Sequence, residues 1–402
     1  MESARIIAGV ARLVRDVGLA EELAHDALVA ALEQWPAEGI PPNPAAWLAT
    51  TARRRAIDWL RRRKLQQRKQ QDLEYQFNEA DFDAEENTLL VDDIGDNLLR
   101  LIFTTCHPAL STEARVALTL KLLGGLTTGE IARAFLVPEV TIAQRIVRAK
   151  RTLAEKHAPF EVPGIHELQE RLASVLEVLY LLFNEGYSAT AGDDRMRPAL
   201  CEEAQRLGRI LAELMPGDAE VHGLVALMEL QASRLRARTG PDGEPILLLD
   251  QDRARWDQLL IHRGLAALQR GKALGQQRGT YLLQAEIAAC HARALAADAT
   301  PWQQIAELYG ELLQVSPSPI IELNRAVAIS MAEGPAAALS LVDPLLQEPA
   351  LASYHLLPSV RGDLLFKLGR HAEAQDEFLR AASMASNVTD RQALLKRADE
   401  CR

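Results

Sequence analysis

The sequence has few cysteines, few aromatic residues and no long apolar run, and each absence excludes a class of protein. The four cysteines (Cys106, Cys201, Cys290 and Cys401) lie far apart and form no CxxC pair, so neither a structural zinc site nor a disulfide framework is expected. Eighteen consecutive apolar residues occur nowhere, which argues against a transmembrane helix, and the N-terminus lacks the pattern of a signal peptide. The sequence therefore predicts a cytoplasmic protein that binds neither a metal nor a membrane.

Catalytic signatures are missing as well. No HExxH, Walker loop or GxSxG motif is present. The adjacent pairs Cys106-His107 and Cys290-His291 have no partners at metal-ligand spacing, and such pairs pack in a core more often than they bind metal. We expect no enzymatic activity and no cofactor.

What the sequence does have is an uneven distribution of charge. The net charge is -10, yet nine Lys or Arg lie between Arg53 and Lys69 against one acid. The stretch 72–96 holds ten acids and no base; without it, residues 1–159 carry +9, whereas residues 160–402 carry -9. A basic front, an acidic connector and an acidic rear are expected when only one end of a chain binds a polyanion.

Apolar residues recur at helical spacing almost throughout, and no alternating strand is visible, which predicts an all-α fold. The first helical block divides at Gly18 and at the loop 36–44. A second block has helices near 96–105, 111–123, 128–136 and 139–155, and further helical segments follow one another from 166 to 385. The predicted domains are 1–70, a flexible acidic linker 71–95, 96–157, and a larger helical domain 160–402.

The last part of the chain resembles a repeat protein. In "LLFKLGRHAEAQDEFLRAASMA" (364–385), Leu-Gly precedes a helix whose small residues allow a second helix to pack closely. This segment resembles a tetratricopeptide repeat. The 160–402 region is therefore predicted to be a tetratricopeptide-like solenoid or bundle.

The segment "GLTTGEIARAFLVPEVTIAQRIVRAKRTL" (125–153) predicts a helix-turn-helix. Thr127 and Glu130 form a capping box that fixes the start of the first helix. The second helix combines an apolar stripe with a face of Gln and Arg, the residue types that contact bases and phosphates in a major groove. An amphipathic helix whose basic face is merely solvated is the other reading, which the capped helix and tight turn make less favourable.

The basic stripe itself reads "AAWLATTARRRAIDWLRRRK" (45–64). Basic residues beside aromatic ones are suited to holding a nucleic-acid backbone while stacking on unpaired bases. Trp47 and Trp59 are also spaced as core residues of a helix, which for Trp59 is the favoured reading. Upstream, residues 18–35 form an amphipathic helix with acids on its exposed side.

The order of these parts resembles an extracytoplasmic-function (ECF) RNA polymerase sigma factor of the sigma-70 family. "AEELAHDALVAALEQW", "AAWLATTARRRAIDWLRRR", an acidic linker and "LTTGEIARAFLVPEVTIAQRIVRAKRTL" carry the resemblance over residues 4–156. "FTTCHPALS", "LLFNEGYSA", "LDQDRARWD", "SPIIELNRAVA" and "LGRHAEA" are similar to the subgroup with a long tetratricopeptide-like C-terminal extension. Two positions depart from the family: Arg54 stands where Asn is common, and Val140 where Gly usually opens the recognition helix.

The resemblance implies partners and site residues. The partners are promoter DNA and the core polymerase, bound at the clamp helices of its largest subunit, and the extension is a candidate binder of a protein or small molecule. Polymerase-binding candidates are Glu21, Glu22 and Asp26. Minus-10 candidates are Trp47, Arg53, Arg54, Arg55 and Arg61. Minus-35 candidates are Gln144, Val147 and Arg148 for bases and Arg145, Lys150 and Arg151 for the backbone.

The implied function is promoter recognition, minus-10 melting and transcription initiation, with regulation by the C-terminal extension. The alternative is a one-component helix-turn-helix regulator whose helical domain senses a ligand. Such a regulator binds its operator unaided and usually as a dimer, whereas a sigma factor needs core polymerase. Two basic modules on one acidic tether favour the sigma factor.

Overall fold

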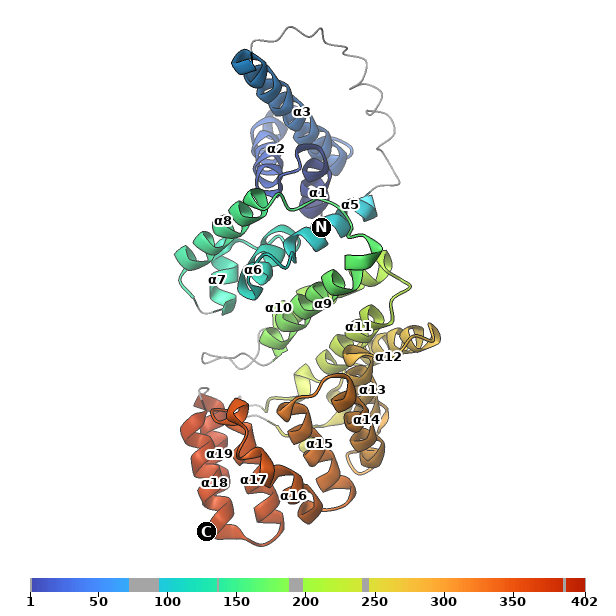
Figure 1. Ribbon diagram of the computed structural model, residues 1–402, viewed down its shortest axis with the longest axis vertical. Coiled ribbons are helices and arrows are strands. Elements are labelled where there is room, and N and C mark those ends of the chain that lie inside the picture. The colour runs from blue at the N-terminus through green and yellow to red at the C-terminus, as the bar shows by residue number, and fades with distance from the viewer. Residues whose placement is uncertain are drawn as a thin grey trace. The chain divides into compact units, whose positions relative to one another are not determined.

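The structure is a computed structural model that describes residues 2–71, 94–135, 137–187, 198–240, 246–385 and 388–401. Every element assigned within these ranges is a helix or a short 3-10 turn, in agreement with the predicted all-α fold. The chain divides into two compact units, Met1–Leu181 and Leu182–Arg402 (Figure 1). The predicted linker 71–95 lies almost entirely outside the described residues, and the domain boundaries at 70, 95 and 157 remain predictions.

The first unit is built from seven helices and the first part of an eighth within the described residues. They are α1 (Glu2–Val14), α2 (Val17–Glu38), α3 (Pro44–Gln71), α5 (Ile94–Thr105), α6 (Thr112–Leu122), α7 (Thr128–Phe135), α8 (Glu139–Glu155) and α9 (Ile165–Tyr187). The predicted bounds of α5 to α8 agree with these within two residues.

The helices α1, α2 and α3 pack against one another through small side chains. Ala8, Ala20, Ala27, Ala52 and Ala56 are fully buried, and the absence of bulk at these positions lets the helix axes approach closely. The predicted break at Gly18 is wrong by two residues. The side chain of Asp16 accepts a hydrogen bond from the N–H of Leu19 at 3.0 Å, so α2 begins at Val17.

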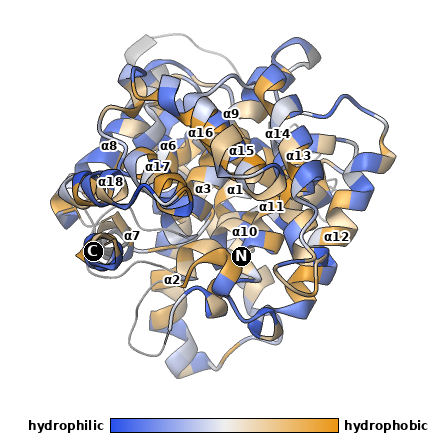
Figure 2. Cartoon of the chain, turned by 90° about the horizontal axis from the view of Figure 1, so that it is seen from below, coloured by the Kyte–Doolittle hydropathy of each residue, from blue (hydrophilic) through white to orange (hydrophobic). Residues whose placement is uncertain are grey.

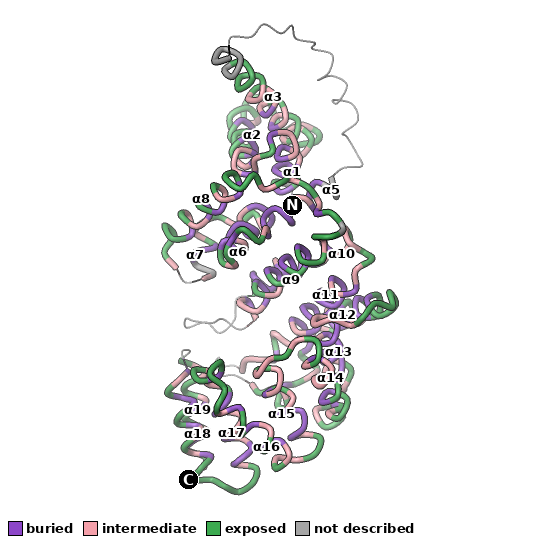
Figure 3. Tube along the Cα trace, in the orientation of Figure 1, coloured by how far each residue is buried: buried purple, intermediate pink, exposed green. Residues whose placement is uncertain are grey.

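The helices α5 to α8 surround a second apolar core. Phe103, Leu118, Leu120, Ile131 and Ile142 have no exposed surface, and α8 packs against both α6 and α7. Figure 3 shows this pattern as buried stretches that recur along α6 and α8. The regular burial fixes which side of α8 faces solvent.

The second unit holds the end of α9 and ten further α-helices in the described part of the chain. They are α10 (Pro198–Leu214), α11 (Ala219–Ala232), α12 (Gln258–Ala273), α13 (Thr280–Arg293), α14 (Trp302–Val315), α15 (Pro319–Ala332), α16 (Pro335–Leu345), α17 (Leu356–Lys367), α18 (His371–Met384) and α19 (Val388–Glu400). The sequence reading ended at 385 and missed α19. It also began α12 at 252, where the structure has a 3-10 turn (Arg253–Arg255).

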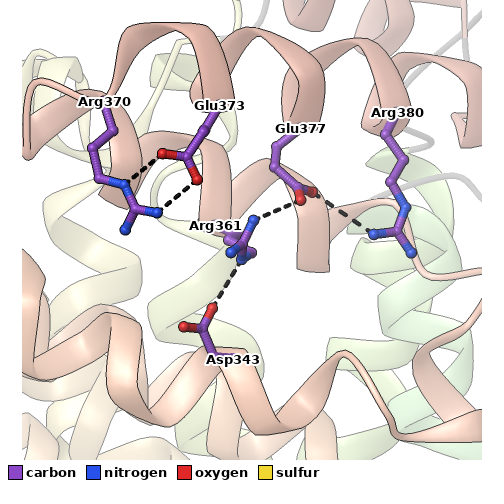
Figure 4. Close-up of polar contacts among 6 residues, drawn as sticks. All are labelled: Asp343, Arg361, Arg370, Glu373, Glu377 and Arg380. Atoms are coloured by element: carbon purple, nitrogen blue, oxygen red, sulfur yellow. Dashed lines mark hydrogen bonds and ion pairs between the residues drawn. The ribbon is translucent and has the colours of Figure 1, made fainter.

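From α14 to α19 each helix packs against the next, and α13 packs against α14. Arg361 on α17 connects its neighbours, because Nε donates to Asp343 of α16 at 2.9 Å and Nη1 donates to Glu377 of α18 at 2.8 Å (Figure 4). One core runs through all of these helices. The stacking fits a helical array, while the tetratricopeptide-like character of the unit stays a prediction.

Hydropathy alternates around most helices, with polar and apolar residues on the same ribbon (Figure 2). The exception is α11, in which all but two of the residues from Ala219 to Ala232 are buried. No described helix is long and apolar enough to cross a membrane.

Candidate nucleic-acid interface

The start of α7 is fixed by the predicted capping box. The hydroxyl of Thr127 accepts from the N–H of Glu130 at 3.2 Å, and the Glu130 carboxylate accepts from the N–H of Thr127 at 2.7 Å. These two bonds satisfy amides that a helix start would leave open. The helix therefore begins at Thr128, and the turn before α8 presents the second helix in a fixed direction. Leu136, in the predicted turn, lies outside the described residues.

The recognition helix α8 has a buried face and an opposite, solvent-facing one. Ile142, Ile146, Ala149 and Leu153 form the buried face, as predicted. The outward face consists of Val140, Gln144, Val147, Arg148 and Arg151, which are all exposed; Val140 and Val147 have 66% and 64% of their surface accessible. Exposed valines between Gln and Arg side chains give this face both apolar and hydrogen-bonding groups.

Two of the predicted minus-35 residues lie on the flanks of α8. Arg145 is half-buried, and its charge is one of the smaller influences that lower the pKa of Glu113, after the backbone and Ser111 hydrogen bonds. Lys150 forms an ion pair with Glu21 of α2 and is also half-buried. The structure thus brings four of the six candidates onto one open face and places Lys150 elsewhere.

The basic helix α3 presents Arg54 and Arg61 to solvent, whereas Arg53 and Arg55 are half-buried. Arg55 forms an ion pair with Asp26 of α2 at 3.4 Å. Both side chains are about half exposed, so this pair contributes little to stability and leaves Arg55 able to exchange partners.

The aromatic residues of α3 are neither fully buried nor free. Trp47 packs edge-on against Trp35 of α2, with ring centroids 5.5 Å apart. Trp59 is half-buried, and the guanidinium of Arg63 lies 5.1 Å from its ring centroid. The core reading of Trp59 is therefore only half right.

The helix α2 carries the acidic candidates and an apolar group that the sequence analysis missed. Glu22 and Asp26 are exposed, but Glu21 is half-buried. Leu28, Val29 and Leu32 are also exposed, Leu32 by 77%. Their helical spacing had the look of a buried stripe, and periodicity alone does not tell a stripe covered by the same domain from one left open for a partner.

The helix α9 supports the α5–α6 region from outside. Arg171 donates to the carbonyl of Phe103 at 3.0 Å, and the hydroxyl of Ser174 donates to the carbonyl of Cys106 at 2.7 Å. Arg115 of α6 donates to Ser174 and pairs with Glu177 at 3.2 Å. Burial lowers the pKa of Arg171. The first compact unit therefore extends beyond residue 157.

In the second unit, the polar segments 183–190 and 250–257 mostly serve the fold. Asp252 accepts from the N–H of Ala254, and Asp257 caps α12 by accepting from two backbone N–H groups. Arg253 donates to the carbonyls of His291 and Ala294. Residues 188–190 lie outside the described residues.

A hollow of about 620 Å³ lies beside these turns. Arg236, Arg255 and Trp256 are among its lining residues, and both arginines are exposed. It is open and shallow, and it is the only feature of this polar region that could hold a ligand among the described residues.

The Cys-His pairs show no metal site. Within the described ranges, no group of three or more His, Cys, Asp or Glu side chains could hold a metal ion. Cys106 is buried, and its Sγ lies 3.5 Å from the hydroxyl of Thr119. His107 accepts from the N–H of Ala109 through Nδ1 and so stabilises a turn.

Comparison with known families divides the chain in the same way as its geometry. Residues 2–66 match sigma-70 region 2, residues 100–153 match sigma-70 region 4, and residues 171–272 match a family of unknown function, DUF6596. The chain is an ECF-type sigma-70 factor. The helices α1–α3 are thus its region 2 and α5–α8 its region 4, and DUF6596 belongs to its helical C-terminal extension. A sigma factor is not an enzyme, and these two regions imply binding to RNA polymerase core and to promoter DNA.

Two relatives support this assignment. The sigma factor is 43% identical over 384 residues to "Uncharacterized protein R00370" of Rhizobium meliloti (strain 1021), which covers 94% of this chain and 89% of that protein. It is 29% identical over 154 residues to "ECF RNA polymerase sigma factor SigK" of Mycobacterium ulcerans (strain Agy99), which covers 37% of this chain and 78% of that protein. The second similarity is confined to a length that fits regions 2 and 4, whereas the first extends through the helical extension.

Proposed function

We propose that the outward face of α8 reads the minus-35 element of the promoter. Gln144, Val147 and Arg148 lie at its centre and have the donors and apolar groups that distinguish bases in a major groove. Arg151, one turn further on, is 76% exposed in its side chain and suits a phosphate. This open face on a helix whose opposite side is fully buried is the observation that carries the proposal.

The minus-10 element is assigned to α3. Arg54 and Arg61 are exposed, and Arg53 and Arg55 lie beside them at half burial, so a phosphate backbone has several cations within reach. Melting costs a few kcal/mol per unstacked base and needs compensating contacts. The Trp35–Trp47 pair offers an aromatic surface at the start of the same helix, which favours stacking of an unpaired base.

Core polymerase is assigned to α2. Leu28, Val29 and Leu32 are exposed beside the acids Glu22 and Asp26. An apolar centre with a charged rim is the usual composition of a protein interface. This arrangement supports the predicted contact with the clamp helices of the polymerase and adds three apolar residues to it. The sigma factor is then expected in the cytoplasm, with its polymerase.

The C-terminal unit is proposed to regulate this activity. It has its own core, and its net charge is opposite to that of regions 2 and 4 once the connector is set aside. The hollow lined by Arg236, Arg255 and Trp256 is a candidate site for an anionic small molecule or side chain. Whether the unit raises or lowers transcription is decided by experiment.

In vitro transcription with purified core polymerase and a random promoter library tests the main proposal. Full-length protein is expected to start new transcripts that core alone does not start. Arg148→Ala should change which promoters are selected, whereas Lys156→Ala, an exposed cation just past the end of α8, should select the same promoters as the wild type.

Two outcomes contradict the proposal. Transcription that is the same with and without the protein would remove the sigma-factor function itself. Tight binding to a palindromic duplex as a dimer, without polymerase, would instead support the one-component regulator.

A further inference from the structure

An acid from the predicted polymerase surface is bound to a cation from the predicted DNA surface. The carboxylate of Glu21 on α2 forms an ion pair with Lys150 of α8 and lies 3.7 Å from the Nζ of Lys121 on α6. Glu21 is only 19% exposed and Lys150 only 23%. Neither side chain is therefore fully available to an outside partner while this contact lasts.

The two helices approach closely around this pair. A Cβ added to Gly18, one turn before Glu21, would lie 3.5 Å from Cδ and 3.8 Å from Cβ of Lys150, which is ordinary van der Waals contact. Nearby, α1 packs against α5 and touches α6. Regions 2 and 4 thus share a contact surface within the first unit, and the ion pair belongs to it.

The contact surface is incompletely packed. It borders a cavity of about 1440 Å³, which Arg63 of α3, Arg100 of α5 and Lys150 line together. Arg15 and His157 also line it, and both have left-handed backbone, with φ of 53° and 51°. Residues other than glycine adopt this conformation at a cost. A large cavity and strained edges are features of a contact that can separate, unlike a close-packed core.

We propose that α2 and α8 are alternative partners for each other, so that the free sigma factor is held closed by the Glu21–Lys150–Lys121 cluster and opens to bind polymerase and promoter. The proposal rests on the functions assigned above to these two helices. Elements at minus 10 and minus 35 are separated by roughly 85 Å of duplex at 3.4 Å per base pair. A unit in which Arg63 and Lys150 line one cavity cannot bind both elements at once.

The sequence permits the opening. The chain between Gln71 and Ile94 can reach at most roughly 75 Å when fully extended. Closing and opening are then two states whose balance polymerase shifts, because it binds only the open one.

A disulfide tests the contact directly. The 3.8 Å between a Cβ at position 18 and that of residue 150 lies within the range for a disulfide. We would make Gly18→Cys/Lys150→Cys in the full chain, oxidise it with oxidised glutathione, and measure its affinity for core polymerase before and after reduction. The comparison stays within one variant, so any direct contribution of Lys150 cancels.

The oxidised double variant is expected to form the cross-link and to bind core polymerase at least about tenfold more weakly than the same protein after reduction. Each single variant and the wild type, treated identically, should be indifferent to the oxidant, since three of the native cysteines are buried. Adding Lys121→Glu, which places an acid beside Glu21, should slow cross-linking.

The outcomes separate this inference from the proposed function. If the cysteines do not cross-link, or if the cross-linked protein binds polymerase as well as the reduced one, the closed state is refuted while the sigma-factor function stands. If neither the wild type nor the reduced variant binds core polymerase, the proposed function fails, and the inference fails with it.

Discussion

The support that α9 gives to region 4 predicts how the sigma factor can be shortened. A protein that ends at Pro159 matches the predicted domain boundary and lacks α9 entirely. One that ends at Tyr187 retains the contacts of Arg171, Ser174 and Glu177 with α5 and α6. We expect the longer protein to be the more stable.

The difference can be worked from three contacts. The bond from the buried guanidinium of Arg171 to the Phe103 carbonyl contributes about 1.5–3 kcal/mol, and the bond from Ser174 to the Cys106 carbonyl about 0.5–1.5 kcal/mol. The Arg115–Glu177 pair is half exposed at Glu177 and adds less than about 1 kcal/mol. Together they amount to about 2–5 kcal/mol, which for a domain of this size shifts the midpoint of thermal unfolding by roughly 5–15 °C.

Thermal unfolding followed by circular dichroism measures the two midpoints. Ser174→Ala in the longer protein is the matched variant and should recover part of the difference, roughly 2–4 °C. Equal midpoints for the two truncations would show that α9 does not support region 4. A deletion at 160 would also be a poor test of regulation, because lost activity would then reflect a weakened region 4.

Three further predictions concern single residues. Arg148→Ala should weaken promoter binding by about 1–3 kcal/mol and relax base preference at one position, whereas Arg151→Ala should weaken all promoters alike and reduce the salt dependence, as binding titrations at several salt concentrations would show. Gly223→Ala should destabilise the second unit by about 1–3 kcal/mol in chemical denaturation, since its Cβ would lie 2.6 Å from the backbone nitrogen of Leu282, while Gly310→Ala on α14, with nothing within 4 Å, should be neutral or slightly stabilising. Burial, with the charges of two nearby arginines, lowers the pKa of His291 to about 3, so the unfolded chain takes up a proton that the folded one refuses; stability should fall by up to about 1.4 kcal/mol per pH unit as pH drops from 6.5 toward 3, and His291→Gln should flatten that dependence.

The sequence predicted best where the determining interactions are local. Thr127 and Glu130 are three residues apart, and their capping box sets the start of α7 as expected. The buried face of α8 follows from its own periodicity. Errors arose where two local signals competed. Gly18 had the look of a break, but glycine is tolerated in a first helical turn, and the carboxylate of Asp16 is the stronger start signal.

Weak or ambiguous patterns account for other misses. The helix α19 buries only Leu394 and Ala398 among its residues, too few to give a clear period. The exposed Leu32 belongs to a stripe that repeats like a buried one. The contact of Glu21 with Lys150 joins positions far apart in the chain, and nothing in the spacing of a single sequence indicates which distant charges will meet.

The central position of α11 limits how a signal could pass through the C-terminal unit. This helix packs against α10, α12 and α13, and Gly223 lets its backbone approach that of α13 directly. A helix enclosed on nearly all sides has no open face on which a messenger molecule could land. Any stimulus must arrive at the surrounding helices, and α11 can then only pass it on by shifting as a rigid rod.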